Sequence, residues 1–508
     1  MGNQESALPF GGGKENKGGD GDDDESFHSG SEYDGHATVQ RHHTEDEIRE
    51  YSSSSISLHD KSIAWKPPEK CVVCGKDLKG GHFNCEEGRK KKPSFEVAIV
   101  GGGIVGTSLA YFLGLAGVNT CIIEREFVGA GASSMSAGTI WCPTNKPLPY
   151  DSTRKPRLGK LCERYIPTQV LCSGSTAIIK SIDEKYDVDY RQPGSISVST
   201  TLAETAALVY EYFLAKSLGF EVQILAGHDL RVAEPRIAPN VWAGLYFPLS
   251  GYVDPSKLTH GLAQAAIDTQ HVTVMEETHI TGIEKSSDGE GHCIRTKCGK
   301  EITSQHVVLA NGVWVNGVAK WFGLTFPVVP VKGQIFLTEE LPPERLPKKI
   351  IFCLSSALYW ASHHTTPAAY ITHSDTGRVF CNHYYGRPTV DGAFMFGGLR
   401  MACPIQDYSV FENYAEYSLS AFQKLYPSSS VHAEQIEGSW SGLMPFTPTG
   451  KLFLGEVRER VWIANGFGPS GIMKSPKACE ILSKEIVARL RGAPVDPKRR
   501  FAPGEYIN

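Results

Sequence analysis

The chain has 508 residues, 41% of them apolar, and a formal net charge of −5. This length allows two domain-sized cores, and the charge lacks the basic surplus typical of nucleic-acid-binding proteins. No apolar run approaches the roughly 18 residues of a membrane-spanning helix, and no signal-peptide pattern opens the chain. Its 13 cysteines follow no regular spacing, which favours reduced thiols over a secreted disulfide scaffold.

Residues 1–66 are rich in Gly, Ser, Asp, Glu and His. They predict a disordered acidic tail, because they offer too little apolar surface to offset the entropy of ordering. The acidic run Gly19–Ser26 is atypical of a mitochondrial transit peptide, so we expect a cytoplasmic protein. Gly2 and Ser6 fit a myristoylation pattern. One acyl chain beside an acidic segment predicts weak membrane contact at most.

Residues 67–92 predict a linker that carries four soft metal ligands, namely Cys71, Cys74, His82 and Cys85. Their spacing fits a small structural zinc site with no open position for chemistry. The gap between Cys74 and His82 is short, so a linker with free thiols is the alternative interpretation.

Residues 94–126 predict a strand, a glycine turn, a helix and a second strand. The turn carries Gly101, Gly103 and Gly106, which suit a tight turn, a close approach to a pyrophosphate and close packing of helix on strand. Glu124 ends the second strand, where a carboxylate can bind a ribose. A dinucleotide site is the resulting prediction, and a glycine turn in an ordinary βαβ unit is the alternative.

A second small-residue cluster, GAGASSMSAG, occupies residues 129–138, where backbone amides and hydroxyls could approach phosphates or a flavin ring. Further on, Asp254 and Pro255 predict the start of an amphipathic helix that continues to about residue 269. Short strands are expected between residues 271 and 310.

Residues 324–434 are β-rich and predict a cap over a cofactor. A strand over 461–465 then leads into a glycine loop over 466–471 and a helix over 472–490. The partial positive charge of such a helix N-terminus would stabilise the negative charge of a reduced flavin. This arrangement favours flavin over nicotinamide.

In chain order, the segments VAIVGGGIVGTSLAYFL with Glu124, GAGASSMSAG, GYVDPSKLTHGLAQAA, VVLANGVWVNGV, VVPVKGQI and NGFGPSGI resemble the family of FAD-dependent oxidoreductases that includes D-amino-acid oxidase, glycine oxidase and sarcosine oxidase. The resemblance implies an α/β (α+β) two-domain flavoprotein over residues 93–495, in which a Rossmann-like FAD-binding domain is interleaved with a β-rich substrate-cap domain. The implied FAD-binding parts are 93–160, 250–323 and 435–495, and the implied cap parts are 161–249 and 324–434.

The resemblance also implies an enzyme that removes a hydride from the carbon next to the nitrogen of a small amine or amino acid. FAD accepts the hydride and is reoxidised by oxygen or another acceptor. The family pattern carries FAD contacts onto Gly101, Gly103, Gly106, Glu124, Ser133, Ser134, Gly138, Ile280, Ala310, Gly312, Trp314, Gly468, Gly471 and Ile472.

Two departures from the family pattern concern the flavin link and the substrate. Ser136 stands where some relatives attach flavin through a histidine, so non-covalent FAD is expected. Pro469 stands near the place where glycine oxidase-like members hold the substrate carboxylate with an arginine. The candidate substrate-binding residues are therefore Arg387, Arg400, Lys474, Tyr384 and Tyr385. The alternatives are surface salt bridges for the two arginines and a solvated helix position for the lysine.

Three functions remain open from the sequence. The first is an FAD-dependent oxidoreductase acting on CH–NH or CH–NH2 groups, with catalytic residues unknown. The second is an FAD-binding assembly factor or scaffold of the same family, which the missing arginine favours. The third, a pyridine-nucleotide dehydrogenase, leaves the later segments unexplained.

Overall fold

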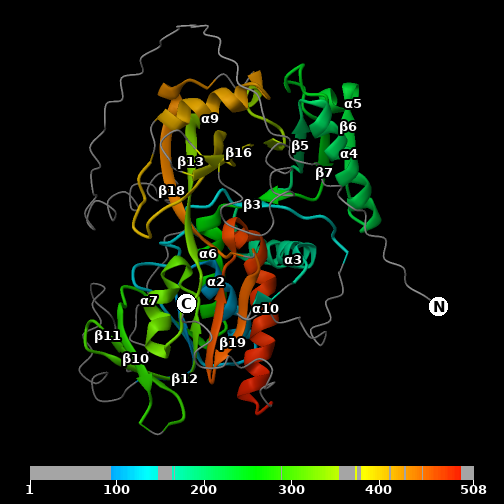
Figure 1. The fold of residues 1–508 in the computed structure, drawn as a ribbon. Coiled ribbons are helices and arrows are strands. Elements are labelled where there is room, and N and C mark those ends of the chain that lie inside the picture. The colour runs from blue at the N-terminus through cyan, green and yellow to red at the C-terminus, as the bar shows by residue number, and fades with distance from the viewer. Residues whose placement is uncertain are drawn as a thin grey trace, which may run out of the picture. The chain divides into compact units, whose positions relative to one another are not determined.

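The computed structural model describes residues 93–493 apart from 147–162, 165, 288, 354–371, 374–378, 411–412, 428–430 and 449. The described residues all belong to one compact unit, which contains two large sheets (Figure 1). The predictions for residues 1–92, namely the acidic tail, the Gly2 acylation pattern and the cysteine/histidine cluster, lie outside the described residues. Within the described ranges, no helix is both long and apolar enough to cross a membrane.

The first sheet, called the parallel sheet here, takes the order β4-β19-β20-β12-β1-β2-β9, and β11 joins β10 to β12. Its strands are β4 (Glu163–Arg164), β19 (Leu452–Arg458), β20 (Val461–Asn465), β12 (Glu301–Leu309), β1 (Ser94–Val100), β2 (Thr120–Ile123), β9 (Val272–Met275), β10 (Ile280–Lys285) and β11 (His292–Thr296). The central pairs β20·β12, β12·β1, β1·β2 and β2·β9 are all parallel.

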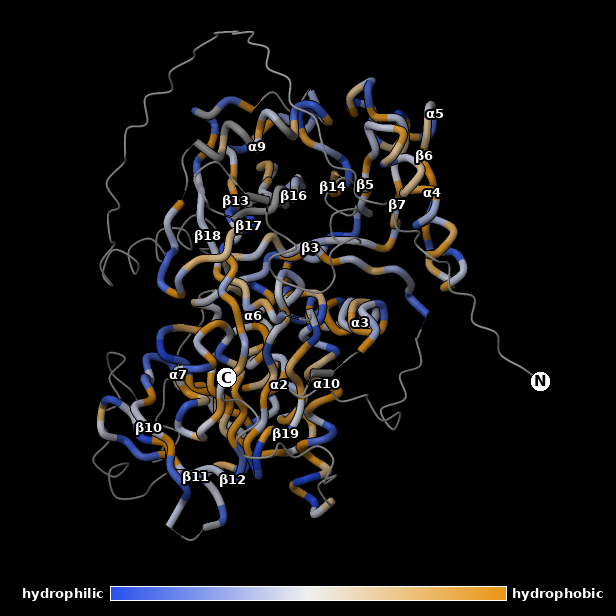
Figure 2. The backbone as a smooth tube through the Cα atoms, viewed as in Figure 1, coloured by the Kyte–Doolittle hydropathy of each residue, from blue (hydrophilic) through white to orange (hydrophobic). Residues whose placement is uncertain are grey.

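Helices and strands bury the parallel sheet on both faces, as a parallel sheet requires. Alternate residues of β1 enter two different cores: Val97 and Ile99 face the helices, whereas Ala98 and Val100 face the other side. The hydrophobic colour of the central strands in Figure 2 reflects this double burial. The helices of this half are α2 (Ile104–Leu115), α3 (Thr168–Tyr186), α6 (Pro255–Ile267), α7 (Val315–Ala319) and α10 (Gly471–Leu490), with the 3-10 turns η2 (Gly312–Trp314), η3 (Lys320–Phe322) and η8 (Gly468–Ser470).

Helix α6 begins where the sequence predicted. The side chain of Asp254 accepts a hydrogen bond from the Lys257 amide, at 2.8 Å, and Pro255 occupies the first helical position. Each feature favours initiation, the first by satisfying an amide that the helix leaves unpaired and the second by its fixed φ.

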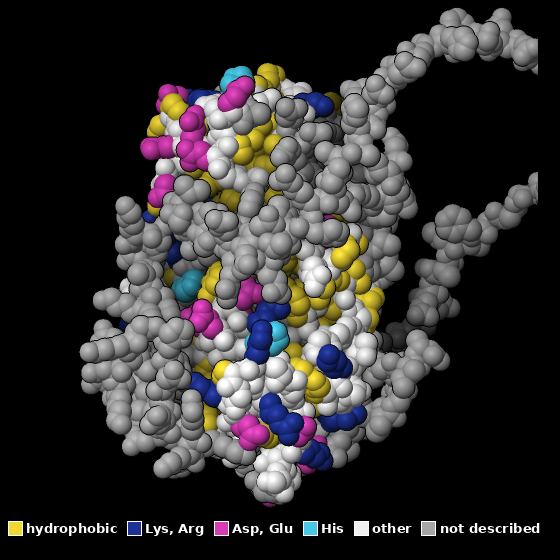
Figure 3. All heavy atoms as spheres, turned by 90° about the vertical axis from the view of Figure 1, so that its left-hand side faces the viewer, with side chains coloured by type: hydrophobic (Ala, Val, Ile, Leu, Met, Phe, Trp, Pro, Cys, Tyr) yellow, Lys and Arg dark blue, Asp and Glu magenta, His cyan; other side chains and the backbone are white. Residues whose placement is uncertain are grey.

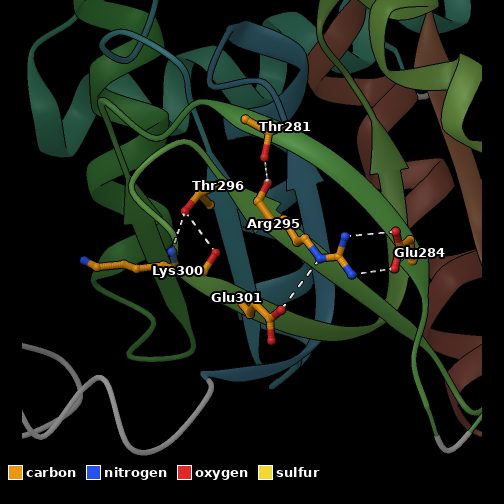
Figure 4. Close-up of polar contacts among 6 residues, drawn as sticks. All are labelled: Thr281, Glu284, Arg295, Thr296, Lys300 and Glu301. Atoms are coloured by element: carbon orange, nitrogen blue, oxygen red, sulfur yellow. Dashed lines mark hydrogen bonds and ion pairs between the residues drawn. The ribbon is translucent and has the colours of Figure 1, made fainter.

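An exposed network ties β10, β11 and β12 together (Figure 4). Arg295 of β11 binds both carboxylate oxygens of Glu284 on β10, at 3.0 and 2.7 Å, and lies 3.7 Å from Glu301 on β12. The hydroxyl of Thr296 accepts from the Lys300 amide at the turn. Because these groups are solvated, we assign them a role in strand register and little stability.

The second sheet, called the cap sheet here, takes the order β18-β13-β17-β16-β14-β5-β7-β6 and is antiparallel except for the pair β14·β5. Its strands are β18 (Ile436–Phe446), β13 (Val329–Glu340), β17 (Ala393–Ala402), β16 (Val379–Pro388), β14 (Ile350–Cys353), β5 (Ser195–Ser199), β7 (Ala243–Phe247) and β6 (Gln223–Ala226), and β15 (Thr372–His373) pairs with β16. The other elements are α4 (Leu202–Ser217), α5 (Gly227–Ala233), α9 (Asn413–Gln423), η4 (Pro343–Arg345), η7 (Ala433–Gln435) and the small pair β3 (Thr139–Ile140) and β8 (Gly251–Tyr252).

The two sheets confirm the predicted combination of a Rossmann-like parallel sheet with a β-rich cap. Strand β18 falls in a range that the sequence assigned to the FAD-binding part, and it pairs with β13 of the cap sheet along its whole length. Helix α3 falls in a range assigned to the cap, and it packs on α10 and α6.

Candidate functional site

The carboxyl ends of four strands meet at one edge of the parallel sheet. In the registers of the parallel pairs, Val100 lies beside Ile123 and Leu309, and Leu309 lies beside Ile463. Each strand continues directly into a segment that the sequence singled out: residues 101–106, Glu124, 310–314 and 466–471. Ligands of open α/β sheets bind at this edge.

The first glycine turn permits a backbone path that a side chain would block. Gly101 has a φ of +109°, and a Cβ there would lie 2.7 Å from the Ala310 carbonyl oxygen. A Cβ on Gly106 would lie 1.9 Å from the Gly101 carbonyl oxygen. The turn and the first helical turn of α2 therefore pack backbone against backbone.

The N-terminus of α2 faces the second small-residue cluster. Its N-cap, Gly103, supplies no side-chain cap, and the Ile104 amide donates to the Ser133 hydroxyl at 2.9 Å. The Ser134 hydroxyl instead lies 3.3 Å from that of Ser256 at the start of α6. A helix N-terminus without an acidic residue in its first turn is suited to a phosphate.

Glu124 closes the turn from the other side. One carboxylate oxygen accepts from the Gly102 amide at 2.7 Å and the other from the Glu126 amide at 3.0 Å. Burial raises the pKa of Glu124, and these two hydrogen bonds oppose that shift. The carboxylate is thus held in place beside the glycine turn.

The segment after β12 lies over the same edge. A Cβ on Gly131 would lie 3.3 Å from the Trp314 ring, and the Arg125 guanidinium lies 5.3 Å from the centre of that ring. Ala310 is buried. The side-chain amide of Asn311 donates to the Trp314 carbonyl at 3.0 Å, whereas its buried oxygen has no hydrogen-bond partner.

Asn311 and Asn465 are site residues that the sequence interpretation missed. Asn465 ends β20 and donates to the Gly312 carbonyl at 2.9 Å, so it ties the C-terminal loop to the segment after β12. It also accepts from the Gly466 amide at 2.7 Å. The only available signal in the sequence was position, because each asparagine lies at or just beyond the end of a strand and precedes a glycine.

The C-terminal loop reaches α2 as well. Gly468 lies in η8, and a Cβ on Gly471 would be 3.9 Å from the Ile104 side chain. Ile472 is buried in the first turn of α10. Gly138 closes the second cluster, where its carbonyl accepts from the Val253 amide at 3.0 Å. Ile280, half-buried at the start of β10, follows Thr278, whose amide donates to the Glu124 carbonyl at 2.8 Å.

Arg387 joins the cap sheet to the second cluster. It is only 3% exposed, and its Nε donates to the Ala137 carbonyl at 2.8 Å. Its Nη1 donates to the Pro388 carbonyl at 3.0 Å, and its guanidinium lies 4.4 Å from the centre of the Tyr252 ring. Burial lowers the pKa of Arg387, but a guanidinium stays charged in proteins.

Alternation along β16 separates the two predicted tyrosines. A Cβ on Gly386 would meet the rings of Phe394 and Phe422, and Tyr384 packs in that same core. Tyr385 shares the opposite face with Arg387. Burial raises the pKa of Tyr385 to about 12, against the opposing charges of Arg400 and Arg387.

The structure therefore brings Arg387, Arg400 and Tyr385 together and leaves two candidates elsewhere. Tyr384 belongs to the core under α9. Lys474, half-buried in the first turn of α10, lies close enough to the buried Cys172 of α3 to influence its pKa. Burial lowers the pKa of Lys474. Neither residue lies on the cap-sheet face that Arg387 occupies.

Comparison with known proteins decides the family. A family model described as FAD dependent oxidoreductase matches residues 96–485. The chain belongs to this family. The predicted family, the enzyme class and FAD as the cofactor are thereby confirmed.

Two relatives, and the solved structure of one of them, illustrate the range of likeness. This oxidoreductase is 28% identical to glycine oxidase of Geobacillus kaustophilus over 75% of this chain and 90% of the relative. It is 29% identical to mitochondrial dimethylglycine dehydrogenase of Rattus norvegicus over 52% of this chain, which spans only 29% of that longer relative. The crystal structure of glycine oxidase from Geobacillus kaustophilus superposes with a TM-score of 0.63 at 24% identity, over 82% of this chain and 100% of that one, which confirms the fold.

The described residues fit FAD in two respects beyond the family match. The N-terminus of α2 follows the glycine turn and has no capping side chain at Gly103, which suits it to a pyrophosphate, and the unpaired oxygen of Asn311 offers an acceptor to a hydroxyl. An acceptor left buried and unpaired costs about 1 to 3 kcal/mol, which a bound donor would recover. Within the described ranges, no group of three or more His, Cys, Asp or Glu residues could hold a metal ion. The four predicted zinc ligands of residues 67–92 lie outside the described residues.

Proposed function

We propose that this FAD-dependent oxidoreductase oxidises a small amine or amino acid that carries a carboxylate, by removing a hydride from the carbon next to the nitrogen. The main support for a carboxylate on the substrate is Arg387, a buried cation on the cap-sheet face next to the second cluster. FAD supplies the electron sink for this chemistry and is reoxidised by oxygen or another acceptor.

The donor geometry of Arg387 leaves room for a carboxylate. Its Nε and Nη1 bind carbonyl oxygens, and its Nη2 makes no hydrogen bond to any described residue. The carboxylate of Asp254 is near enough to act on it electrostatically, but no hydrogen bond joins the two in the described part of the chain. A buried cation with no anion in contact is costly, and a carboxylate ligand would relieve that cost with a charge-assisted hydrogen bond.

The neighbouring side chains would orient the substrate. Tyr385 stays protonated at neutral pH because burial raises the pKa of its phenol to about 12, so it can donate a hydrogen bond. Arg400, close to Tyr385, adds a second positive charge on the same side. The protein's part would be to bind the neutral amine, fix the carboxylate and exclude water.

For the cofactor, we propose that non-covalent FAD contacts the residues at the carboxyl edge of the parallel sheet. They are Gly101, Gly103, Gly106, Glu124, Ser133, Ser134, Gly138, Ile280, Ala310, Gly312, Trp314, Gly468, Gly471 and Ile472, to which the geometry adds Asn311. Segments of the parallel sheet form the FAD-binding domain in this proposal, and segments of the cap sheet form the substrate domain.

The N-terminal predictions stand as part of the proposal. We infer a cytoplasmic location, with weak membrane contact if Gly2 is acylated. Metal analysis of the purified full chain, with and without replacement of Cys71 and Cys74, tests the proposed zinc site at Cys71, Cys74, His82 and Cys85.

Anaerobic titration of the purified yellow protein tests the function. We expect bleaching of the flavin band by amino acids or N-methyl amino acids, and much weaker bleaching by the same compounds as methyl esters. Arg387→Gln should raise the substrate KM by about 10- to 100-fold, as expected for loss of a charge-assisted hydrogen bond, with the FAD content unchanged.

The matched control is Arg295→Gln, at an arginine that is 52% exposed and remote from the cap sheet, which should leave KM unchanged. A protein that no amine reduces would contradict the enzymatic proposal and favour a scaffold. Equal reduction by acids and esters would exclude the role given to Arg387.

A further inference from the structure

Residues 133–138, called the bridge segment here, are bound from two sides. On the side of the parallel sheet, the Ser133 hydroxyl accepts from the Ile104 amide at the start of α2, at 2.9 Å. On the side of the cap sheet, the indole Nε1 of Trp440 donates to the Met135 carbonyl at 3.3 Å. The bridge segment therefore joins the N-terminus of α2 to strand β18.

Packing fixes Trp440 in the place from which it reaches the bridge segment. Trp440 lies opposite Ile335 of β13, and both pack in one apolar cluster with Ala137. Two positions further along β18, a Cβ on Gly442 would lie 2.8 Å from the Met135 Cβ. Residues two apart in a strand share a face, so β18 offers Met135 a donor at one position and an empty space at the other.

A second carbonyl of the bridge segment is held from the cap side as well. The Nε of Arg387 donates to the Ala137 carbonyl at 2.8 Å. Trp440 and Arg387 thus hold the two peptide groups on either side of the one that joins Ser136 to Ala137. Because peptide groups are planar, fixing both neighbours limits how the middle one can turn. The Ala137 amide makes no hydrogen bond to any described residue, so it remains available to a ligand.

Surface charge on the face shown in Figure 3 does not single out a place for an anionic dinucleotide, because positive and negative side chains are interspersed among its described residues. Fixed donors within the fold carry more weight. A preorganised amide needs no reorganisation when negative charge develops on a ligand.

We propose that Trp440 is a positioning residue for the flavin, because its hold on the Met135 carbonyl fixes the bridge segment and keeps the Ala137 amide directed at the cofactor. The inference rests on the FAD site proposed above. A reduced flavin carries more negative charge than an oxidised one, so a fixed donor stabilises the reduced form more. Loss of the Trp440 contact should therefore weaken FAD binding and lower the midpoint potential of the flavin.

Trp440→Phe tests the contact in the full-length FAD-loaded protein, because it removes the indole donor and keeps an aromatic ring in the apolar cluster. We expect the dissociation constant of FAD to rise about 2- to 10-fold, as for the loss of one neutral hydrogen bond. The midpoint potential should fall by about 10 to 30 mV, which corresponds to a 2- to 10-fold greater loss for reduced than for oxidised FAD. Hydrogen exchange of the amides in residues 133–138 should become faster.

The matched control is Trp242→Phe, at an indole that is 51% exposed just before β7. It should leave FAD affinity, potential and exchange unchanged. Wild-type values of all three in Trp440→Phe would overturn the inference and leave the FAD site intact. Weaker FAD binding at an unchanged potential would reduce Trp440 to a packing role and would overturn it too. A wild-type protein that retains no FAD would overturn the FAD site itself, and the inference with it.

A second variant disturbs the same segment and leaves Trp440 in place. Gly442→Ala brings a Cβ to 2.8 Å from the Met135 Cβ, so it should displace the bridge segment and lower the potential in the same direction. An unchanged potential in this variant would show that the position of the bridge segment does not matter to the flavin, which contradicts the proposal.

Discussion

The two sheets of this oxidoreductase use different means to build one site. At the edge of the parallel sheet, backbone groups dominate: the glycine turn, the amides that Glu124 accepts and the N-terminus of α2. In the cap sheet, buried charged side chains dominate, among them Arg387, Lys332 and Glu234. The half of the site at the parallel sheet thus depends on glycines that leave backbone groups accessible. The half at the cap sheet depends on charged side chains that are buried.

The largest loss of stability is expected when a single methyl group is added to the glycine turn at the edge of the parallel sheet. Gly106→Ala places a Cβ 1.9 Å from the Gly101 carbonyl oxygen, which forces the turn and α2 apart. We expect a loss of more than about 5 kcal/mol of stability and loss of bound FAD, measured by denaturant unfolding and the flavin spectrum. Gly317→Ala is the matched control, because nothing lies within 4 Å of a Cβ on that helical glycine. Equal stability of the two variants would show that the close approach is unimportant.

The second-largest effect on stability is expected at the buried ion pair between Lys332 and Asp407 in the cap sheet, where replacing either partner should have a different cost. The Lys332 ammonium is fully buried and lies 3.0 Å from Asp407, whose side chain is 27% exposed. Asp407→Asn removes the anion from a buried cation and should cost about 3 to 5 kcal/mol in urea unfolding. Lys332→Met leaves a carboxylate that water can reach, so its cost should be smaller. The reverse order would contradict this account of the pair.

Acid should weaken the parallel sheet through two buried histidines. Burial and the charge of Arg460 lower the pKa of both His292 and His306 to about 4, and Trp462 donates to His306 Nδ1 at 2.9 Å. Because the unfolded chain binds these protons at higher pH, stability should fall as pH drops from about 6.5 to 4, by on the order of 3 kcal/mol for each histidine.

Thermal unfolding across this pH range measures the effect. His306→Gln keeps an acceptor for Trp462 but takes up no proton, so its curve should be flatter. The same change at the exposed His271 should leave the curve as in the wild type. An unchanged slope in the His306 variant would argue against the buried-histidine mechanism.

The cap sheet should show the opposite pH dependence through Glu234. Burial raises the pKa of this fully buried carboxyl to about 7, against hydrogen bonds from the Lys348 amide and the Tyr426 hydroxyl. The folded state therefore holds the proton longer than the unfolded chain, and this contribution is lost as pH rises from about 4.5 to 7.

Glu234→Gln should accordingly lose less stability than the wild type between pH 4.5 and 8 in the same unfolding assay. Its side-chain oxygen can still accept from Tyr426. A steeper decline in the variant than in the wild type would mean that Glu234 is stabilising in its charged form.

The sequence predicted the parallel sheet well for a local reason. Gly101, Gly103, Gly106 and Glu124 lie within one βαβ unit, so their spacing in the chain fixes their spacing in space. The start of α6 at Asp254 and Pro255 could also be predicted from neighbouring residues. The placement of β18 in the cap sheet could not be predicted in this way, because its partner β13 lies about a hundred residues away in the chain.

The candidate substrate-binding residues could be named from the sequence, but the sequence did not show which of them share one face of the cap sheet. Alternation on β16 puts Tyr385 beside Arg387 and turns Tyr384 into the core under α9. A register shift between β16 and β17 at Asn382/Tyr385 alters which side chains share a face, and no residue pattern announces it. The contact of Trp440 with the Met135 carbonyl was also invisible, since the two residues lie 305 positions apart in the chain.

The sequence by itself determined the family, the FAD cofactor and the residues that form the glycine turn, because these depend on short-range backbone geometry. Only the tertiary structure decided that Arg387 reaches Ala137, that Asn311 keeps an unpaired buried oxygen, and that β18 holds the second cluster. Those features depend on burial and on contacts between distant segments, which the packing of the two sheets creates.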